Sequence, residues 1–144
     1  MKTVRVTWWF AALALALSMP AIGFDAKAQD KEPQPQMVAT ILKVGIDIEE
    51  SNPPNLVVTA TGQVPTGGYT KTRLLRATYT TPPDDGMQDY FLLAVPPGGI
   101  APQIVSKVSA SNTWKAYTKE APWLKGIRVH GVGKGVVVEM LKGK

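Results

Sequence analysis

The sequence has no cysteine and only one histidine, and each scarcity removes a class of function. Without cysteine there can be no disulfide, thiolate metal site, iron–sulfur cluster or cysteine nucleophile. The lipid-bearing cysteine of an exported lipoprotein is missing too. Zinc sites generally need more than one nitrogen or sulfur ligand, and His130 is the only imidazole. We therefore expect a domain held together by its apolar core, with no cofactor and no metal-binding residue.

Catalytic motifs are also lacking. A hydrolytic triad would need His130 beside an acid and a nucleophilic serine, and no motif places those partners. The glycine-rich residues 131–135 fail as a phosphate loop, since Gly135 stands where a hydroxyl is needed and a β-branched run follows instead of a helix. We expect a hairpin loop there, His130 at the surface beside it, and no catalytic residue.

Three aspartates surround Gly86 and could in principle hold calcium. A calcium loop of the EF-hand kind needs a longer alternation of oxygen donors that ends in a glutamate, and this is absent. Aspartate is common in turns because its side chain bonds the nearby backbone, so a turn explains the pattern without a metal. A small hydrolase using His130 or this cluster is the least favoured functional alternative. The three residues are Asp84, Asp85 and Asp89.

The first 28 residues have the order of a secretory signal peptide. Lys2 and Arg5 precede an uncharged apolar run over residues 8–17, Pro20 follows, and residues 26–28 (Ala-Lys-Ala) form a small-x-small cleavage site. A retained membrane anchor is the alternative, because residues 6–24 are about long enough to cross a bilayer. Pro20 and the cleavage site favour removal. We expect a bacterial protein exported to the periplasm or the extracellular space.

Removing residues 1–28 takes away three basic residues and Asp25, which lowers the net charge from +5 to +3. Such a mild charge on an exported protein does not support nucleic acid as a partner. No later stretch approaches transmembrane length, so no stable membrane insertion is expected after processing.

Residues 29–36 are polar and proline-bearing, which is typical of a flexible lead-in, and residues 37–144 are expected to form a single β domain. Short runs with period-2 alternation or β-branched side chains predict strands between turns rich in Gly, Pro, Asp and Asn. In residues 37–50 the apolar positions of one parity run from Val38 through Leu42 to Ile48. The predicted strands are residues 37–50, 56–62, 69–80, 89–95, 102–109, 124–130 and 136–141, with residues 112–119 left ambiguous.

About seven short strands at intervals of roughly ten residues predict an all-β fold with almost no helix. A small antiparallel β-sandwich, immunoglobulin-like in size, is the expected packing. Residues 89–95 are the most apolar stretch and are expected to form a central strand. A small β-barrel is the alternative, because periodicity does not distinguish a closed sheet from a sandwich.

Aromatic residues are the first candidate binding feature. Tyr69 follows a glycine turn, and Trp114, Tyr117 and Trp123 lie in the less regular region from 112 to 123. Aromatic faces bordered by polar groups can stack on sugars or bind a protein groove. The alternative is that both tryptophans are core residues at the ends of the sandwich.

A basic cluster is the second candidate, since Lys71, Arg73 and Arg76 lie within six residues. Lys71 and Arg73 share a strand face and could meet an anionic surface, such as an acidic polysaccharide or lipid headgroups. More often such residues keep a strand face soluble and discourage edge pairing.

These features favour an exported, non-catalytic module that binds a protein or a cell-envelope component through its loops, where rigid β scaffolds usually carry recognition. A carbohydrate-binding module and a protease-inhibitor-like domain are the alternatives. The expected partner is thus an unidentified protein or glycan.

Overall fold

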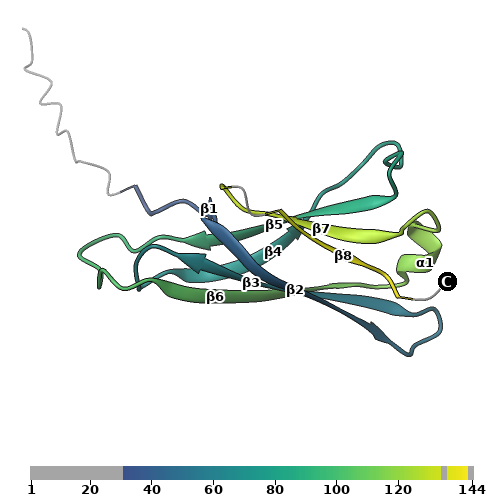
Figure 1. Cartoon of the computed structure of the whole chain (residues 1–144), viewed down its shortest axis with the longest axis horizontal. Coiled ribbons are helices and arrows are strands. Elements are labelled where there is room, and N and C mark those ends of the chain that lie inside the picture. Colours follow the sequence, from purple (N-terminus) through teal and green to yellow (C-terminus); the bar gives the residue numbers. More distant parts are fainter. Residues whose placement is uncertain (1–30, 134–135, 143–144) are drawn as a thin grey trace, which may run out of the picture. The chain divides into compact units, whose positions relative to one another are not determined.

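Eight strands and one short helix make up the part of the chain that the computed structural model describes, which is residues 31–133 and 136–142 (Figure 1). The predicted signal peptide lies outside these residues. No helix among them is long and apolar enough to span a bilayer. The elements are β1 (Gln36–Met37), β2 (Thr40–Glu49), β3 (Asn55–Val64), β4 (Thr70–Arg76), β5 (Met87–Val95), β6 (Ser106–Trp114), α1 (Tyr117–Glu120), β7 (Gly126–His130) and β8 (Val136–Met140).

The strands form two sheets that pack against each other. In the first sheet β5 is central, with β4 along one edge, β7 and β1 along the other, and β8 outside β7. The second sheet has the order β2-β3-β6 and is antiparallel throughout. The predicted all-β sandwich is confirmed, and so are the central position of β5 and the β7–β8 hairpin. An immunoglobulin-like topology remains a prediction.

One pair of strands departs from the antiparallel expectation, because β5 and β7 run parallel, with Met87 opposite Gly126 and Phe91 opposite His130. After β5 the chain crosses to the second sheet as β6 and returns through α1. It has then reversed direction twice, so β7 enters the first sheet in the same direction as β5. Parallel neighbours need such a crossover, and β6 with α1 supplies it.

The core lies between the sheets and is built from alternate residues of their central strands. In β3, Leu56, Val58 and Ala60 are fully buried, and Tyr90 and Leu92 of β5 face them from the other sheet. Each large apolar side chain fully removed from water contributes about 2 kcal/mol to stability. This contribution is what a small domain without disulfides depends on.

The predicted alternation of β2 is wrong in its first half. Leu42 was expected inside but is 43% exposed, and its neighbour Ile41 is buried instead. A register shift between Ile41 and Lys43 explains the change, since an extra residue in one strand moves the following side chains to the opposite parity. Ile48, near the end of the same strand, is also exposed.

The fifth strand begins later in the chain than predicted. It begins at Ser106 rather than at residue 102, and its expected anchors Ile104 and Val105 are exposed in the preceding loop. The strand continues to Trp114, through the first part of the segment left ambiguous. The side-chain amide of Asn112 donates to Leu74 O in β4 at 3.2 Å, which joins β6 to the neighbouring edge of the first sheet.

The loops gather at two ends of the sandwich (Figure 1). The end called here the α1 end holds α1 and the β2–β3 and β4–β5 loops. The end called here the tip holds the β3–β4 loop, residues 65–69, and the β5–β6 loop, residues 96–105.

Candidate functional site

A pocket of about 310 Å³ opens at the α1 end and is the strongest candidate for a binding site. Two strand ends frame it, because Arg76 closes β4 and Trp114 closes β6. The β4–β5 loop and the segment around α1 complete its wall. The lining residues are Arg76, Ala77, Thr78, Tyr79, Thr80, Pro82, Gln88, Trp114, Glu120 and Trp123.

Three side chains from separate elements are locked together in one wall of the pocket. The guanidinium carbon of Arg76 lies 3.9 Å from the centroid of the Trp114 ring, a distance typical of a cation–π contact. The indole Nε1 of Trp114 donates to Glu120 Oε2 at 2.6 Å. Arg76 Nη1 reaches the same oxygen at 3.5 Å, so its ion pair with Glu120 is long and partly exposed. The wall is thus rigid, while the Arg76 side chain stays at the pocket surface.

The position of Glu120 follows from the turn that starts α1. Ala116 adopts a left-handed conformation, with φ of 51°, and its backbone N–H donates to Asn55 Oδ1 at 3.0 Å. Asn55 begins β3 and therefore fixes this turn to the second sheet. The turn brings Glu120 back over Trp114.

Two further aromatic rings complete the pocket. Tyr79 and Trp123 contact each other edge to face, with centroids 6.4 Å apart, and both are partly exposed. Gln88 also lines the pocket and is only 2% exposed. Its amide donates to the carbonyls of Ala77 and Asp89, so this buried polar group is hydrogen-bonded as expected. The pocket therefore combines aromatic surface with charged and amide groups.

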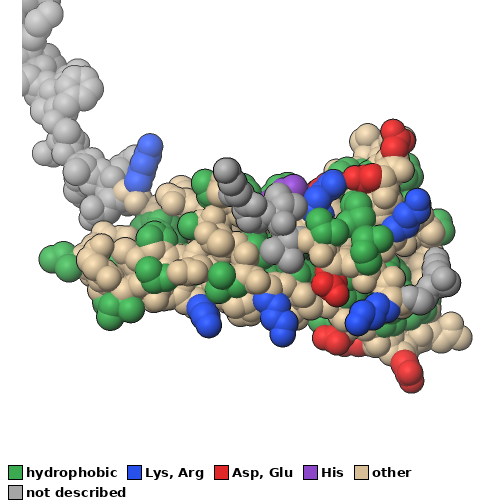
Figure 2. All heavy atoms as spheres, in the orientation of Figure 1, with side chains coloured by type: hydrophobic (Ala, Val, Ile, Leu, Met, Phe, Trp, Pro, Cys, Tyr) green, Lys and Arg blue, Asp and Glu red, His purple; other side chains and the backbone are tan. Residues whose placement is uncertain are grey.

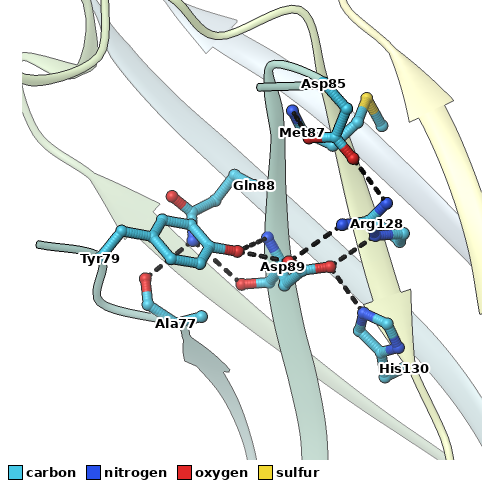
Figure 3. A network of polar contacts seen from close by, with 8 residues as sticks. All are labelled: Ala77, Tyr79, Asp85, Met87, Gln88, Asp89, Arg128 and His130. Carbon is cyan, nitrogen blue, oxygen red and sulfur yellow. Dashed lines mark hydrogen bonds and ion pairs between the residues drawn. The ribbon is translucent and has the colours of Figure 1, made fainter. Parts of the chain in front are cut away.

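Beside the pocket, the outer face of the first sheet carries a charge network centred on Asp89 (Figure 3). Arg128 Nε donates to Asp89 Oδ1 at 2.5 Å and its Nη2 to Oδ2 at 3.1 Å, a two-point ion pair. The Tyr79 hydroxyl donates to Oδ2, and His130 Nε2 lies 2.6 Å from Oδ1. Arg128 Nη1 also donates to Asp85 Oδ2 at 2.9 Å.

The network favours the ionised form of Asp89. Burial raises the pKa of this carboxyl, but the hydrogen bonds from Arg128, His130 and Tyr79 together lower it well below its usual range. The bond to Asp89 raises the pKa of Arg128, and burial together with Asp89 raises that of Tyr79. Because Asp89 is a carboxylate, His130 Nε2 carries the proton and donates.

This network has the form of a structural cluster. The Asp89 carboxylate is occupied by three donors, so it is poorly suited to act as a base. No serine or threonine hydroxyl of the described residues bonds His130, whose ring stacks on Phe91 with centroids 5.3 Å apart. His130 lies beside the β7–β8 loop on the outer face of the first sheet, where its side chain is 27% exposed and bound to Asp89.

Two of the three aspartates around Gly86 bind the same arginine side chain. Asp85 and Asp89 both bind Arg128, whose guanidinium already supplies the positive charge that an ion would bring. The backbone N–H of Met87 donates to Asp85 Oδ1 at 3.0 Å, and this bond is the main cause that lowers the pKa of Asp85. Asp85 thus closes the turn, as turn-forming aspartates do. In residues 31–133 and 136–142, no cluster of three His, Cys, Asp or Glu could hold a metal.

The candidate residues from the sequence fall into two groups. Trp114 and Trp123 line the pocket together, although Trp114 is only 5% exposed, and Tyr117 is buried beside it in the core. Tyr69, Lys71 and Arg73 lie instead toward the tip, at the start of β4. A register shift between Thr70 and Arg73, with φ of 48° at Lys71, interrupts the strand where Lys71 and Arg73 were predicted to share a face; both are exposed.

Sequence reasoning missed Tyr79, Gln88 and Glu120 as pocket residues and noted Arg76 only as part of a basic cluster. Their contacts join positions 6 to 44 residues apart, and no local motif records such pairings. The one available signal was an arginine at the end of one predicted strand and a tryptophan near the end of another.

No protein-family description, curated protein or solved structure matches this chain.

Proposed function

We propose that the chain is an exported, non-catalytic binding module, and that the pocket at the α1 end binds a saccharide of the cell envelope. The observation that carries this proposal is the pocket itself, where Trp114, Trp123 and Tyr79 meet Arg76 and Glu120 in about 310 Å³. The signal-peptide pattern of residues 1–28 supports export. The Asp89 carboxylate already accepts hydrogen bonds from three side chains and is poorly placed to act as a base, which favours binding over catalysis.

The chemistry of the lining fits a sugar better than a purely apolar ligand. Sugar rings present C–H groups that pack on aromatic rings and hydroxyls that bond to charged and amide side chains. Here Trp123 offers a partly exposed ring, and Arg76 is free of any short ion pair in the described structure. A saccharide with a carboxylate would gain a charge-assisted hydrogen bond to Arg76.

Intrinsic fluorescence reports on this pocket directly. Trp8 and Trp9 lie in the predicted signal peptide, so the processed chain keeps Trp114 and Trp123 as its only tryptophans. Both line the pocket. Titration of the processed chain with neutral and carboxylate-bearing oligosaccharides should shift or quench its emission in a saturable way.

Variants separate specific binding from a general optical effect. Trp123→Ala should abolish binding, and Arg76→Gln should weaken the binding of carboxylate-bearing sugars about tenfold more than that of neutral ones. Arg73→Gln, three residues earlier on the same strand and outside the pocket, is the matched control and should bind normally. If none of the oligosaccharides changes the emission, or if Trp123→Ala binds as the wild type does, the proposal is wrong.

A further inference from the structure

The β5–β6 loop exposes a group of apolar side chains that the fold does not use. Ile100 is fully exposed, Ile104 is 68% exposed and Val105 is 57% exposed. Single exposed apolar residues are ordinary on protein surfaces, but three within one ten-residue loop concentrate exposed apolar side chains at this end of the molecule. Hydrophobic side chains protrude at this end of the molecule in Figure 2.

The loops of the tip contain no charged residue. Residues 96–105 read PPGGIAPQIV, and residues 64–70 of the neighbouring turn read VPTGGYT. Pro96, Pro97 and Pro102 have no backbone N–H, so moving this loop out of water desolvates fewer donors than usual. Gly67 N donates to Pro102 O at 3.0 Å, which ties the two loops together. The two loops of the tip are thus joined to each other, and few backbone N–H groups of the β5–β6 loop would lose water on burial.

Three cations lie at the base of the tip, on the adjoining strands β4 and β6. Lys71 and Arg73 begin β4, and Lys107 begins β6; all three are exposed. Among the acidic residues that the structure describes, only Glu32 lies at this end, where it pairs with Lys71 at 3.0 Å. On the face seen in Figure 2 the acidic side chains gather toward the α1 end. The charge of the domain is thus polarised along the sandwich.

We propose that the tip docks reversibly on the surface of an anionic phospholipid bilayer, with Ile100, Ile104 and Val105 entering the headgroup region. An apolar tip with exposed cations along one side of its base matches the two parts of such a surface, since the hydrocarbon boundary accepts the aliphatic chains and the anionic headgroups attract the cations. The contact is peripheral and uses loops, so it requires no transmembrane segment. A hydrophobic protein groove would accept the isoleucines but would not by itself attract the neighbouring cations.

Sedimentation with lipid vesicles tests the proposal. The processed chain should bind vesicles of phosphatidylcholine mixed with phosphatidylglycerol, bind pure phosphatidylcholine much more weakly, and dissociate as salt is added. Replacing both isoleucines, Ile100→Ser with Ile104→Ser, should reduce the partition coefficient by more than about tenfold. Each of Arg73→Gln and Lys107→Gln should reduce it about fivefold.

Matched variants at the other end keep the test specific. Ile48→Ser removes an exposed isoleucine near the α1 end, and Lys119→Gln removes an exposed lysine of α1. Both should bind the mixed vesicles as the wild type does, and all variants should melt at nearly the wild-type temperature. The proposal is overturned if the wild type ignores the mixed vesicles, or if the double isoleucine variant binds them unchanged. Because this readout does not involve the pocket, its failure leaves the saccharide proposal standing.

Discussion

The two ends of the sandwich differ in the side chains that they expose. At the α1 end charged and polar side chains are joined in networks, and Asp89 alone receives bonds from Arg128, His130 and Tyr79. At the tip, Ile100 extends fully into solvent and the loops hold no charge. A side chain buried in a network contributes to stability, whereas an exposed apolar one contributes almost nothing to the fold. The comparison therefore separates residues kept for structure from residues available for a partner.

The largest effect is expected from Asp89→Ala. Three donors lose their acceptor, and the positive charge of Arg128 is left without its main partner in a partly buried position. We expect the free energy of unfolding to fall by about 3 kcal/mol, measured by chemical denaturation. Asp84→Asn, in the same turn and exposed, is the control and should change it by less than about 0.5 kcal/mol. Equal effects of the two variants would contradict the assigned role of the network.

Glycine substitutions sharpen the comparison between the ends. At Gly86, near the pocket, φ is 69° and an added Cβ would lie 3.0 Å from the backbone oxygen of Trp123, so Gly86→Ala should cost about 2 kcal/mol. At Gly99, in the tip, an added Cβ would meet nothing within 4 Å, so Gly99→Ala should be nearly neutral. Thermal melting of both variants measures the difference. If Gly99→Ala lowers the melting temperature as much as Gly86→Ala does, the open space at Gly99 is contradicted.

The smallest effect is the dependence of stability on acid. The pKa of Asp89 is lower in the folded than in the unfolded chain. Asp89 therefore contributes its full share to the free energy of unfolding above the unfolded-state pKa of about 3.9. This contribution is lost as the pH falls from there toward the folded-state pKa. Below about pH 4 the free energy of unfolding of the wild type should fall by up to about 1 kcal/mol per pH unit because of Asp89. Asp89→Asn should show a shallower loss in denaturation curves over the same range. An identical slope would contradict the link between Asp89 and acid stability.

Much of the fold could be predicted from the sequence because strand alternation is a local property. The strong apolar pattern of residues 89–95 identified the central strand β5, and the glycine-rich residues 131–135 identified the β7–β8 hairpin. In β6 the pattern was present but weak, since its inward residues Val108 and Ala110 are small and the more apolar Ile104 and Val105 precede the strand. Because the loop before β6 is more hydrophobic than the start of β6, the sequence pattern predicts a strand that begins in the loop.

The candidate site could be predicted only in part. Trp114 and Trp123 were recognised by residue type, because large aromatic rings in an irregular segment are recognisable locally. The partners of the Asp89 network depend on the parallel register of β5 and β7, which places Asp89 opposite Arg128. That register results from the crossover through β6 and α1, and the shift in β4 likewise depends on tertiary packing. Neither has a local pattern in the sequence.

The separation of the two ends is tested most directly by a backbone-amide NMR map of the processed chain with anionic bicelles that carry a spin-labelled lipid. The spin label broadens amide signals close to the lipid. We predict broadening of residues 98–105 and of the adjoining β3–β4 loop, with the signals of α1 and residues 77–82 unchanged. Broadening centred on the α1 end, or spread evenly over both ends, would contradict the account.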